Sequence, residues 1–344
     1  MVRALEWIDE PGVLRLIDQT RLPGEVAYID VATVDSLVDA IQKLAVRGAP
    51  ALGVAGAFGV AVAMDQGQRE GWSATELEGQ VDRIRHARPT AVNLAAGVDE
   101  AWSLRALGIP AVVTLAKELA ERDEAANRRL SRLGADWVLR RTGKERVRVV
   151  THCNTGALAT AAWGTAYGII HELHDRGALE YVYADETRPL LQGARLTSWE
   201  LLQDRIPHAV EVDGAAASTI LRGLADVAII GADRIAANGD TANKVGSVSL
   251  ALAAARASIP FVVAAPSSTV DLATASGEDI EIELRDGGEV LSLAGVRTAP
   301  EGSTGFNPAF DVTPHDLISA IVTEFGIVEP DRAAEPRLLA KLVG

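Results

Sequence analysis

Cysteine is almost absent from this sequence, since Cys153 is the only one in 344 residues. A single cysteine excludes an intrachain disulfide and is typical of proteins from a reducing compartment. Aromatic residues are also scarce, at 4% of the chain, whereas glycine and alanine are abundant. This composition disfavours a β-sandwich and favours closely packed helices with tight strand-to-helix turns.

Positive charge is in the minority, and the formal net charge is -14. An acidic surface repels nucleic acid and anionic membranes, so we expect neither as a partner. A phosphorylated ligand stays compatible with this charge if arginines are concentrated locally.

Long hydrophobic runs are missing as well. The N-terminal residues 1–9 contain no apolar core of a signal peptide. An uncharged run rich in alanine and glycine, residues 48–64, is bounded by Arg47 and Asp65 and is slightly short for a bilayer span of ~20 residues. We therefore predict a buried helix here and a cytoplasmic protein.

Motifs for common cofactors are absent too. There is no Walker A pattern and no Gly-x-Gly-x-x-Gly after a predicted strand. The six histidines show no zinc-like spacing. The sequence thus predicts neither a nucleotide cofactor nor a bound metal.

The pattern of apolar residues predicts two domains, as expected for a chain of this length. Residues 1–140 are mostly helical after a short strand near residues 24–29, and residues 141–144 form a plausible linker. From residue 141 to 344, apolar strands alternate with helical segments. This alternation predicts an α/β fold, with a helical N-terminal domain followed by a Rossmann-like doubly wound parallel sheet.

The predicted elements can be placed along the chain. We expect helices at residues 35–45, 50–64, 111–133, 157–174, 198–203 and 245–257, and strands of the parallel sheet at residues 146–151, 181–184, 209–212, 227–230 and 261–265.

Polar or reactive groups follow four of these strands. They are Cys153-Asn154, Asp185-Glu186-Thr187, Gly231-Ala232-Asp233 and Pro266-Ser267-Ser268. Ligands of doubly wound sheets bind beyond the carboxyl ends of the strands. The convergence therefore predicts that Cys153 belongs to a site and is more than a small core residue.

Two of these groups have a specific chemical interpretation. Cys153 lies between an apolar strand and a predicted helix, whose dipole would favour a thiolate or an anionic ligand. The adjacent His152 points to the opposite side of the strand, which argues against a Cys–His protease dyad. Asp233 is either a turn or N-cap residue, or a desolvated carboxyl with a raised pKa that acts as a general acid.

Anion-binding groups occur elsewhere in the chain. Arg47-Gly48-Ala49-Pro50 begins a helix, where an arginine beside free N–H groups can bind phosphate, although a solvent-exposed arginine explains this pattern equally well. Arg88, before Pro89 and Thr90, has the same two interpretations. Asn243 and Lys244 begin another predicted helix and could hold phosphate.

Taken together, these motifs resemble those of the methylthioribose-1-phosphate isomerases of methionine salvage, a family that includes the regulatory subunits of translation initiation factor 2B. The resemblance extends over almost the whole chain. It is carried by Arg47-Gly48-Ala49-Pro50-Ala51, Arg88-Pro89-Thr90-Ala91-Val92-Asn93-Leu94, Thr151-His152-Cys153-Asn154-Thr155-Gly156, Glu186-Thr187-Arg188-Pro189, Gln192-Gly193-Ala194-Arg195-Leu196-Thr197, Gly231-Ala232-Asp233-Arg234-Ile235, Asn243-Lys244-Val245-Gly246, Ala265-Pro266-Ser267-Ser268-Thr269 and residues 307–314.

The resemblance implies an aldose–ketose isomerase, an intramolecular oxidoreductase acting on a phosphorylated pentose without a cofactor. Cys153 and Asp233 would be the catalytic pair. Asp233 would donate a proton during ring opening, and Cys153 would either transfer the C2 proton to C1 or stabilise a hydride shift. The implied substrate-binding residues are Arg47, Gly48, Ala49, Arg88, Gln192, Asn243 and Lys244. The family is typically dimeric, so a homodimer is expected.

One departure from the family pattern is Ile282-Glu283-Leu284-Arg285, followed by Asp286-Gly287-Gly288-Glu289-Val290, where the family commonly has Ile-Glu-Glu-Arg. It affects the local loop and leaves the predicted catalytic residues unchanged. Two alternatives stay open: an isomerase for 5-deoxyribose 1-phosphate or ribose 1,5-bisphosphate, and a non-catalytic regulatory protein of the initiation factor 2B type.

Overall fold

The computed structural model describes residues 2–88, 91–330 and 339–343. Two compact units make up the chain: unit 1 comprises Met1–Ala126 and Gly156–Gly164, and unit 2 comprises Asn127–Thr155 and Thr165–Gly344. The division therefore lies inside a helix, α5 (Ile109–Thr142), and not at the predicted boundary of 140/141. The predicted linker is the end of that helix, where Gly143 adopts a positive φ of 66°.

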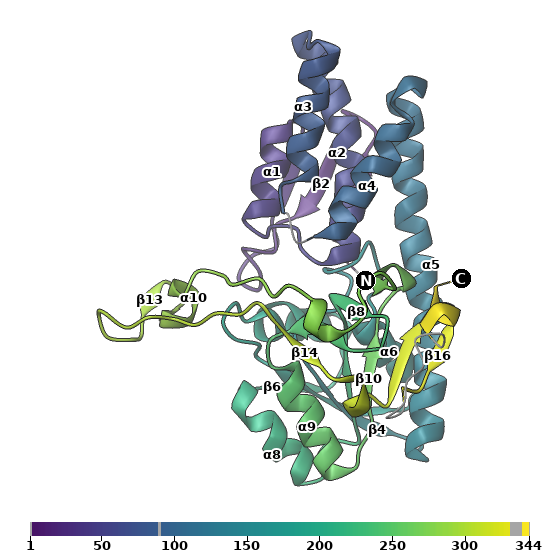
Figure 1. Ribbon diagram of the computed structural model, residues 1–344, viewed down its shortest axis with the longest axis vertical. Coiled ribbons are helices and arrows are strands. Elements are labelled where there is room, and N and C mark those ends of the chain that lie inside the picture. The colour runs from purple at the N-terminus through teal and green to yellow at the C-terminus, as the bar shows by residue number, and fades with distance from the viewer. Residues whose placement is uncertain (1, 89–90, 331–338, 344) are drawn as a thin grey trace. The chain divides into compact units, whose positions relative to one another are not determined.

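Unit 1 packs helices against a small antiparallel sheet in the order β1-β2-β3 (Figure 1). The prediction of one strand near residues 24–29 missed β1 and β2, because each is short and carries a charged residue between its apolar ones. The elements are β1 (Leu5–Ile8), β2 (Val13–Ile17), β3 (Tyr28–Val31), α1 (Val34–Gln42), α2 (Ala49–Glu70), α3 (Ala74–Arg85), α4 (Val92–Ser103) and the first part of α5.

Helix α2 is the central apolar helix of unit 1. Among the described residues it is the one helix that is long and apolar enough to cross a membrane by length and composition, and 78% of its most apolar stretch is buried. Such burial is typical of a core helix. Its residues join those of α1, α4 and β2 in one hydrophobic cluster.

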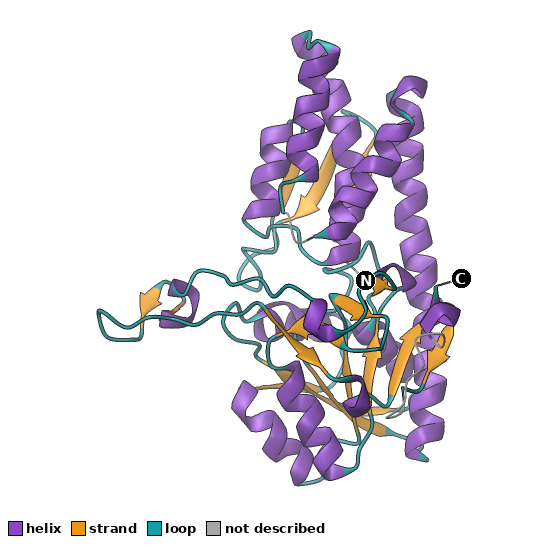
Figure 2. Cartoon of the chain, viewed as in Figure 1, coloured by secondary structure: helices purple, strands orange, loops and turns teal. Residues whose placement is uncertain are grey.

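Unit 2 is built on a seven-stranded sheet in the order β16-β15-β10-β7-β4-β5-β6, in which only β16 runs antiparallel. Figure 2 shows helices on both faces of this sheet. Its strands are β4 (Val147–Thr151), β5 (Leu179–Asp185), β6 (His208–Glu211), β7 (Val227–Ile230), β10 (Phe261–Ala264), β15 (Ala320–Thr323) and β16 (Gly326–Val328), and its helices are α6 (Ala166–Asp175), α7 (Ser198–Gln203), α8 (Ala216–Leu221) and α9 (Ser247–Ala257).

Side chains alternate between the two faces of the sheet along each strand, and they form two separate hydrophobic cores, one on each face. In β4, Val149 packs with residues of α5 and α6, whereas Val150 packs with residues of α8 and α9. Burial on both faces explains why the strands are continuously apolar, and this confirms the predicted doubly wound fold.

The strand order reverses between β4 and β7. From β4 the chain adds β5 and β6 on one side, and then returns to add β7, β10 and β15 on the other. This reversal is the topological switch point, outside which ligands of such sheets bind. The carboxyl ends of the neighbouring strands β10, β7, β4 and β5 lie at one edge, as the sequence predicts.

A smaller sheet and a hairpin complete unit 2. The sheet has the order β11-β8-β9-β14, and its strands are β11 (Val270–Asp271), β8 (Arg234–Ala236), β9 (Thr241–Lys244) and β14 (Phe310–Thr313). The hairpin contains α10 (Gly288–Leu291), β12 (Ser292–Leu293) and β13 (Val296–Arg297). The departure from the family pattern lies at its base, where Arg285 binds Glu289 and Glu283 and Leu284 is exposed.

Candidate active site

Cys153 lies on a strained turn directly after β4. Its φ is 63°, a left-handed conformation that is rare for a residue with a Cβ, and its side chain is buried. Two threonine hydroxyls hold the backbone: Thr187 accepts the N–H of Cys153 at 2.9 Å, and Thr197 donates to its carbonyl at 2.6 Å. Such strain persists only where the surroundings enforce it, and it is concentrated at functional sites.

The helix predicted at residues 157–174 begins only at Ala166. The preceding segment, Gly156–Gly164, belongs to unit 1, and its backbone groups bond to partners elsewhere in that unit: Gln19 donates to the Leu158 carbonyl and Asp123 accepts the Ala161 N–H. These tertiary contacts override the helix propensity of the alanines. The prediction that a helix dipole acts on Cys153 was therefore wrong.

His152 is fully buried and directly follows the end of β4. Its Nδ1 lies 2.8 Å from Asp185 Oδ2, and its Nε2 lies 2.8 Å from the carbonyl oxygen of Val245. Both ring nitrogens are thus committed to acceptors on other segments. From the sequence, Asp185 is predicted only as a strand-end residue, without a partner.

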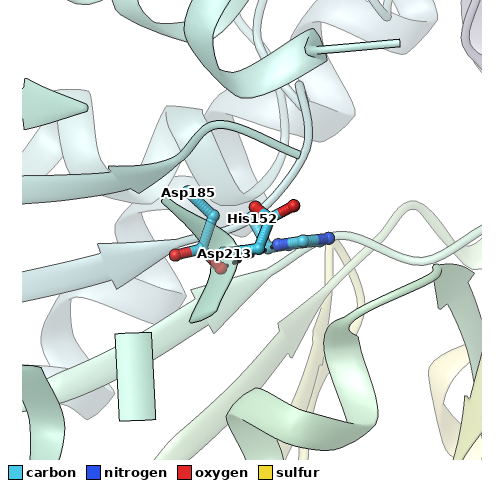
Figure 3. Close-up of side chains that lie close together, drawn as sticks. All are labelled: His152, Asp185 and Asp213. Carbon is cyan, nitrogen blue, oxygen red and sulfur yellow. Dashed lines mark hydrogen bonds and ion pairs between the residues drawn. The ribbon is translucent and has the colours of Figure 1, made fainter. Parts of the chain in front are cut away.

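Figure 3 shows that His152 and Asp185 gather with Asp213, a residue that the sequence analysis missed. One ligand atom of each lies within 4.8 Å of the others, close enough for a small cation. The Asp213 carboxylate also accepts the N–H groups of Thr187 and Arg188, both at 2.7 Å. Its place after β6 could have been found only by knowing the strand order.

Asp233 follows β7, on the other side of the switch point from Cys153. The two loops touch, since a Cβ added to Gly231 would lie 2.6 Å from Thr155 Cγ2. The side chain of Asp233 is exposed, so the expected desolvation by the apolar strand was wrong. The strand ends at Ile230, and the Asp233 N–H already bonds to Ala242 in the smaller sheet.

Gln192 precedes a short π-helical turn, Gly193–Thr197, which leads into α7. Its side chain is 5% exposed, and its Oε1 is buried without a hydrogen-bond partner among the described residues. Buried amide oxygens are normally paired, and π-helical turns are frequent at functional sites. Gln192 can thus accept a hydrogen bond from a bound ligand.

Asn243 and Lys244 end strand β9, and the helix α9 starts after them at Ser247. Asn243 donates to Ser247 Oγ at 2.8 Å, and Lys244 Nζ donates to the Ala309 carbonyl at 2.6 Å. The first N–H groups of α9 bind Asp311 Oδ2 instead of a free anion. Asp311 therefore occupies the position at which a phosphate would cap this helix.

The other predicted binding residues belong to unit 1. Gly48 precedes α2 with φ of 93°, and a Cβ there would lie 2.1 Å from the Ala159 carbonyl oxygen, so only glycine fits. Arg47 and Ala49 flank it, and the helix start has no side-chain cap. Arg88 is half-buried, whereas Pro89 and Thr90 of the same motif lie outside the described residues.

The model of the initiation factor 2 subunit family matches residues 45–330. A probable bifunctional methylthioribose-1-phosphate isomerase/methylthioribulose-1-phosphate dehydratase from Nocardia farcinica is 50% identical over 97% of this chain, which spans 60% of that protein's length. A methylthioribose-1-phosphate isomerase from Pelotomaculum thermopropionicum is 46% identical over 96% of this chain and 92% of its own.

Two solved structures are similar over 99% of this chain. One is 5-methylthioribose 1-phosphate isomerase from Pyrococcus horikoshii OT3, with a TM-score of 0.89, 36% identity and 96% of that chain covered. The other is translation initiation factor eIF-2B, subunit delta, from A. fulgidus, with a TM-score of 0.85, 38% identity and 100% of that chain covered.

Proposed function

The chain belongs to the initiation factor 2 subunit family, and from that membership we propose that it is an aldose–ketose isomerase. Its reaction would convert 5-methylthioribose 1-phosphate to 5-methylthioribulose 1-phosphate, the step named for its isomerase relatives. The observation that carries this proposal is the pair of residues beside the switch point, Cys153 after β4 and Asp233 after β7.

The chemistry requires few groups. The reaction moves a hydrogen from C2 to C1 of the sugar, so the substrate is its own oxidant and reductant. The phosphate on C1 prevents easy ring opening, and Asp233 would donate the proton that opens the ring and then relay protons to the sugar oxygens. Cys153 would either carry the C2 proton to C1 through an enolate-like species or stabilise a hydride shift.

Substrate binding would complete the surroundings of the catalytic side chains. Because Asp233 is exposed, only a bound substrate can desolvate its carboxyl and favour the protonated acid. The buried oxygen of Gln192 is suited to accept a sugar hydroxyl. Arg47, Gly48, Ala49 and Arg88, with Asn243 and Lys244, remain our predicted binding residues.

We further propose that the protein works in the cytoplasm as a homodimer. Its single cysteine and acidic composition are typical of a protein in a reducing compartment that binds neither nucleic acid nor membranes. Sedimentation equilibrium would test the dimer directly.

A regulatory protein of the initiation factor type is the second candidate, favoured by the similarity to an eIF-2B delta subunit. A protein that only binds partners would not need both a strained cysteine and an aspartate at the switch point. If a variant that lacks both the Cys153 thiol and the Asp233 carboxylate still performed the protein's function, this alternative would be favoured.

A direct assay tests the proposal. The purified protein would be given 5-methylthioribose 1-phosphate, 5-deoxyribose 1-phosphate and ribose 1,5-bisphosphate separately, with ketose formation followed by NMR. We expect a strong preference for the first. Comparable rates on the first two would indicate a broader deoxypentose-phosphate isomerase, because a small apolar group contributes only ~1–3 kcal/mol to discrimination. No turnover by folded protein would reject the enzyme.

A further inference from the structure

His152 connects three segments of unit 2 that carry predicted site residues. Its own strand end continues into Cys153, its Nδ1 binds Asp185 at the end of β5, and its Nε2 binds the carbonyl of Val245. Val245 directly follows Asn243 and Lys244 on β9. A single imidazole therefore joins the catalytic turn to the predicted binding strand.

The hydrogen-bond pattern determines where the protons lie. A carbonyl oxygen can only accept, so the Nε2 that faces Val245 must carry a hydrogen. Nδ1 faces a carboxylate oxygen, so one more proton is shared between His152 and Asp185. Burial alone lowers the pKa of His152, but the hydrogen bond to Asp185 and the charges of Asp185 and Asp213 outweigh it and raise that pKa.

The groups around His152 and Asp185 favour retention of the proton that the two side chains share. Asp185 is 2% exposed, and burial raises the pKa of its carboxyl, so the pair loses its shared proton reluctantly. Asp213 and Asp311 are the other charged groups that face the ring, and both are acidic.

The backbone at Gly246 lies close against the His152 ring. A Cβ on Gly246, whose φ is 113°, would lie 2.7 Å from His152 Cε1. Only glycine thus lets the Val245 carbonyl approach the ring edge. The Gly246 N–H is in turn held by Asp311, which pairs with Asn243 across β14 and β9.

We infer that His152 is a positioning residue, which fixes the Cys153 turn at a set distance from the Asn243–Lys244 strand by bridging Asp185 and Val245. The inference rests on the proposed isomerase function, because it gives the bridge a role in catalysis. Its physical basis is that small displacements of a reacting group lower the rate steeply, by up to about 100-fold per ångström.

Two substitutions of His152 test its two hydrogen bonds separately, the bond to Asp185 and the bond to the Val245 carbonyl. In His152→Asn the amide nitrogen replaces Nδ1, so the bond to Asp185 is kept and the bond to Val245 is lost. We expect KM to rise about 10-fold or more and kcat to change less, because the binding strand is released. In His152→Gln the amide nitrogen replaces Nε2, so the opposite split is expected, with kcat falling more than KM rises.

His86→Asn is the matched control, because His86 is an exposed histidine of unit 1 with 63% of its side chain accessible. Wild-type kcat and KM in both folded His152 variants would overturn the inference. Equal losses in both parameters for both variants, in proportion to a lower Tm, would also overturn it, since they would indicate a purely structural histidine.

A measurement on the unaltered protein removes the dependence on these variants folding and on the assay. Two-bond ¹H–¹⁵N spectra of the histidine rings report each ring nitrogen, with His152 assigned by through-bond correlation of its ring to its own backbone and to its sequence neighbours. We expect a protonated Nε2 and a proton at Nδ1 shared with Asp185. An unprotonated Nε2, or a metal-bound Nδ1 that a chelator releases, would overturn the bridge.

The ring spectrum and the turnover assay together distinguish a failure of the proposed function from a failure of the His152 bridge. The expected ring spectrum in a protein that turns over none of the three sugar phosphates would reject the proposed function and leave the bridge intact. Normal turnover with an unprotonated Nε2 would reject the bridge and leave the function intact.

Discussion

The hydroxyl of Thr187 accepts the backbone N–H of Cys153 at 2.9 Å, and it donates to the Asp185 carbonyl at 3.0 Å. Both Cys153 and Thr187 have positive φ, 63° and 64°. Each such residue costs about 1–3 kcal/mol of strain, and the bond to the Thr187 hydroxyl helps to hold the Cys153 backbone in this conformation. The conformation of the predicted catalytic turn therefore depends on a side chain from the loop after the neighbouring strand, β5.

Replacing Thr187 by valine tests this dependence. Valine matches the shape of threonine but leaves the buried N–H of Cys153 without an acceptor, at a cost of about 1–3 kcal/mol. We expect a lower urea midpoint and a reduced kcat in Thr187→Val. Thr187→Ser keeps the hydroxyl and should retain most of both. A valine variant with wild-type stability and turnover would show that the turn does not need this bond.

Cys153→Ser should remove most turnover. Serine is similar in size, but its hydroxyl is a much weaker nucleophile and a weaker acid than a thiol, so proton transfer to or from carbon is slowed. Far-UV circular dichroism and the urea midpoint should stay close to those of the parent. Wild-type kcat in this variant would exclude a chemical role for the thiol.

Asp233→Asn should abolish turnover with almost no change in stability. The side chain is exposed, and exposed substitutions usually alter the free energy of unfolding by no more than about 0.5 kcal/mol. Asparagine cannot donate a carboxylic proton, so ring opening should fail. Asp316→Asn, another exposed aspartate of unit 2, is the control and should have normal kcat. Equal kcat in the two variants would remove Asp233 from the mechanism.

The parallel sheet could be predicted because β7 and β10 are buried on both faces and are therefore uninterrupted apolar runs. Because parallel strands all run in the same direction, their carboxyl ends lie at one edge of the sheet whatever the strand order. The segment after Cys153 could not be predicted, because its conformation is set by contacts with Gln19 and Asp123, far away in sequence. The His152–Asp185 pair was missed for the same reason, since it requires knowing that β4 and β5 are neighbours.

Arg47→Ala should raise KM for the sugar phosphate while kcat changes little. A hydrogen bond to a charged group contributes about 1.5–3 kcal/mol, which corresponds to a roughly 10- to 100-fold effect on KM. Arg69→Ala is the control, because Arg69 lies near the end of the same helix, α2, in an exposed ion pair with Asp65. If KM is the same for both variants, Arg47 does not bind the phosphate.

Asp226 gives a prediction for the pH dependence of stability. It is 8% exposed and binds Lys144 and Arg148. Burial raises the pKa of its carboxyl, but the hydrogen bonds from Arg148 and Lys144 outweigh burial and lower that pKa from 3.8 to about 2. Because the folded-state pKa is depressed, the stabilisation is present above the unfolded value of 3.8 and is lost as the pH falls towards about 2.

Asp226→Asn should therefore lower the free energy of unfolding by roughly 2 kcal/mol near neutral pH, and the difference from the parent should shrink as the pH is lowered from about 5 to about 3. Urea unfolding at several pH values measures this directly. Asp136→Asn removes an exposed ion pair with Arg176 and should cost less than about 1 kcal/mol. A difference for Asp226→Asn that stayed constant down to about pH 3 would mean that its effect comes from packing instead of charge.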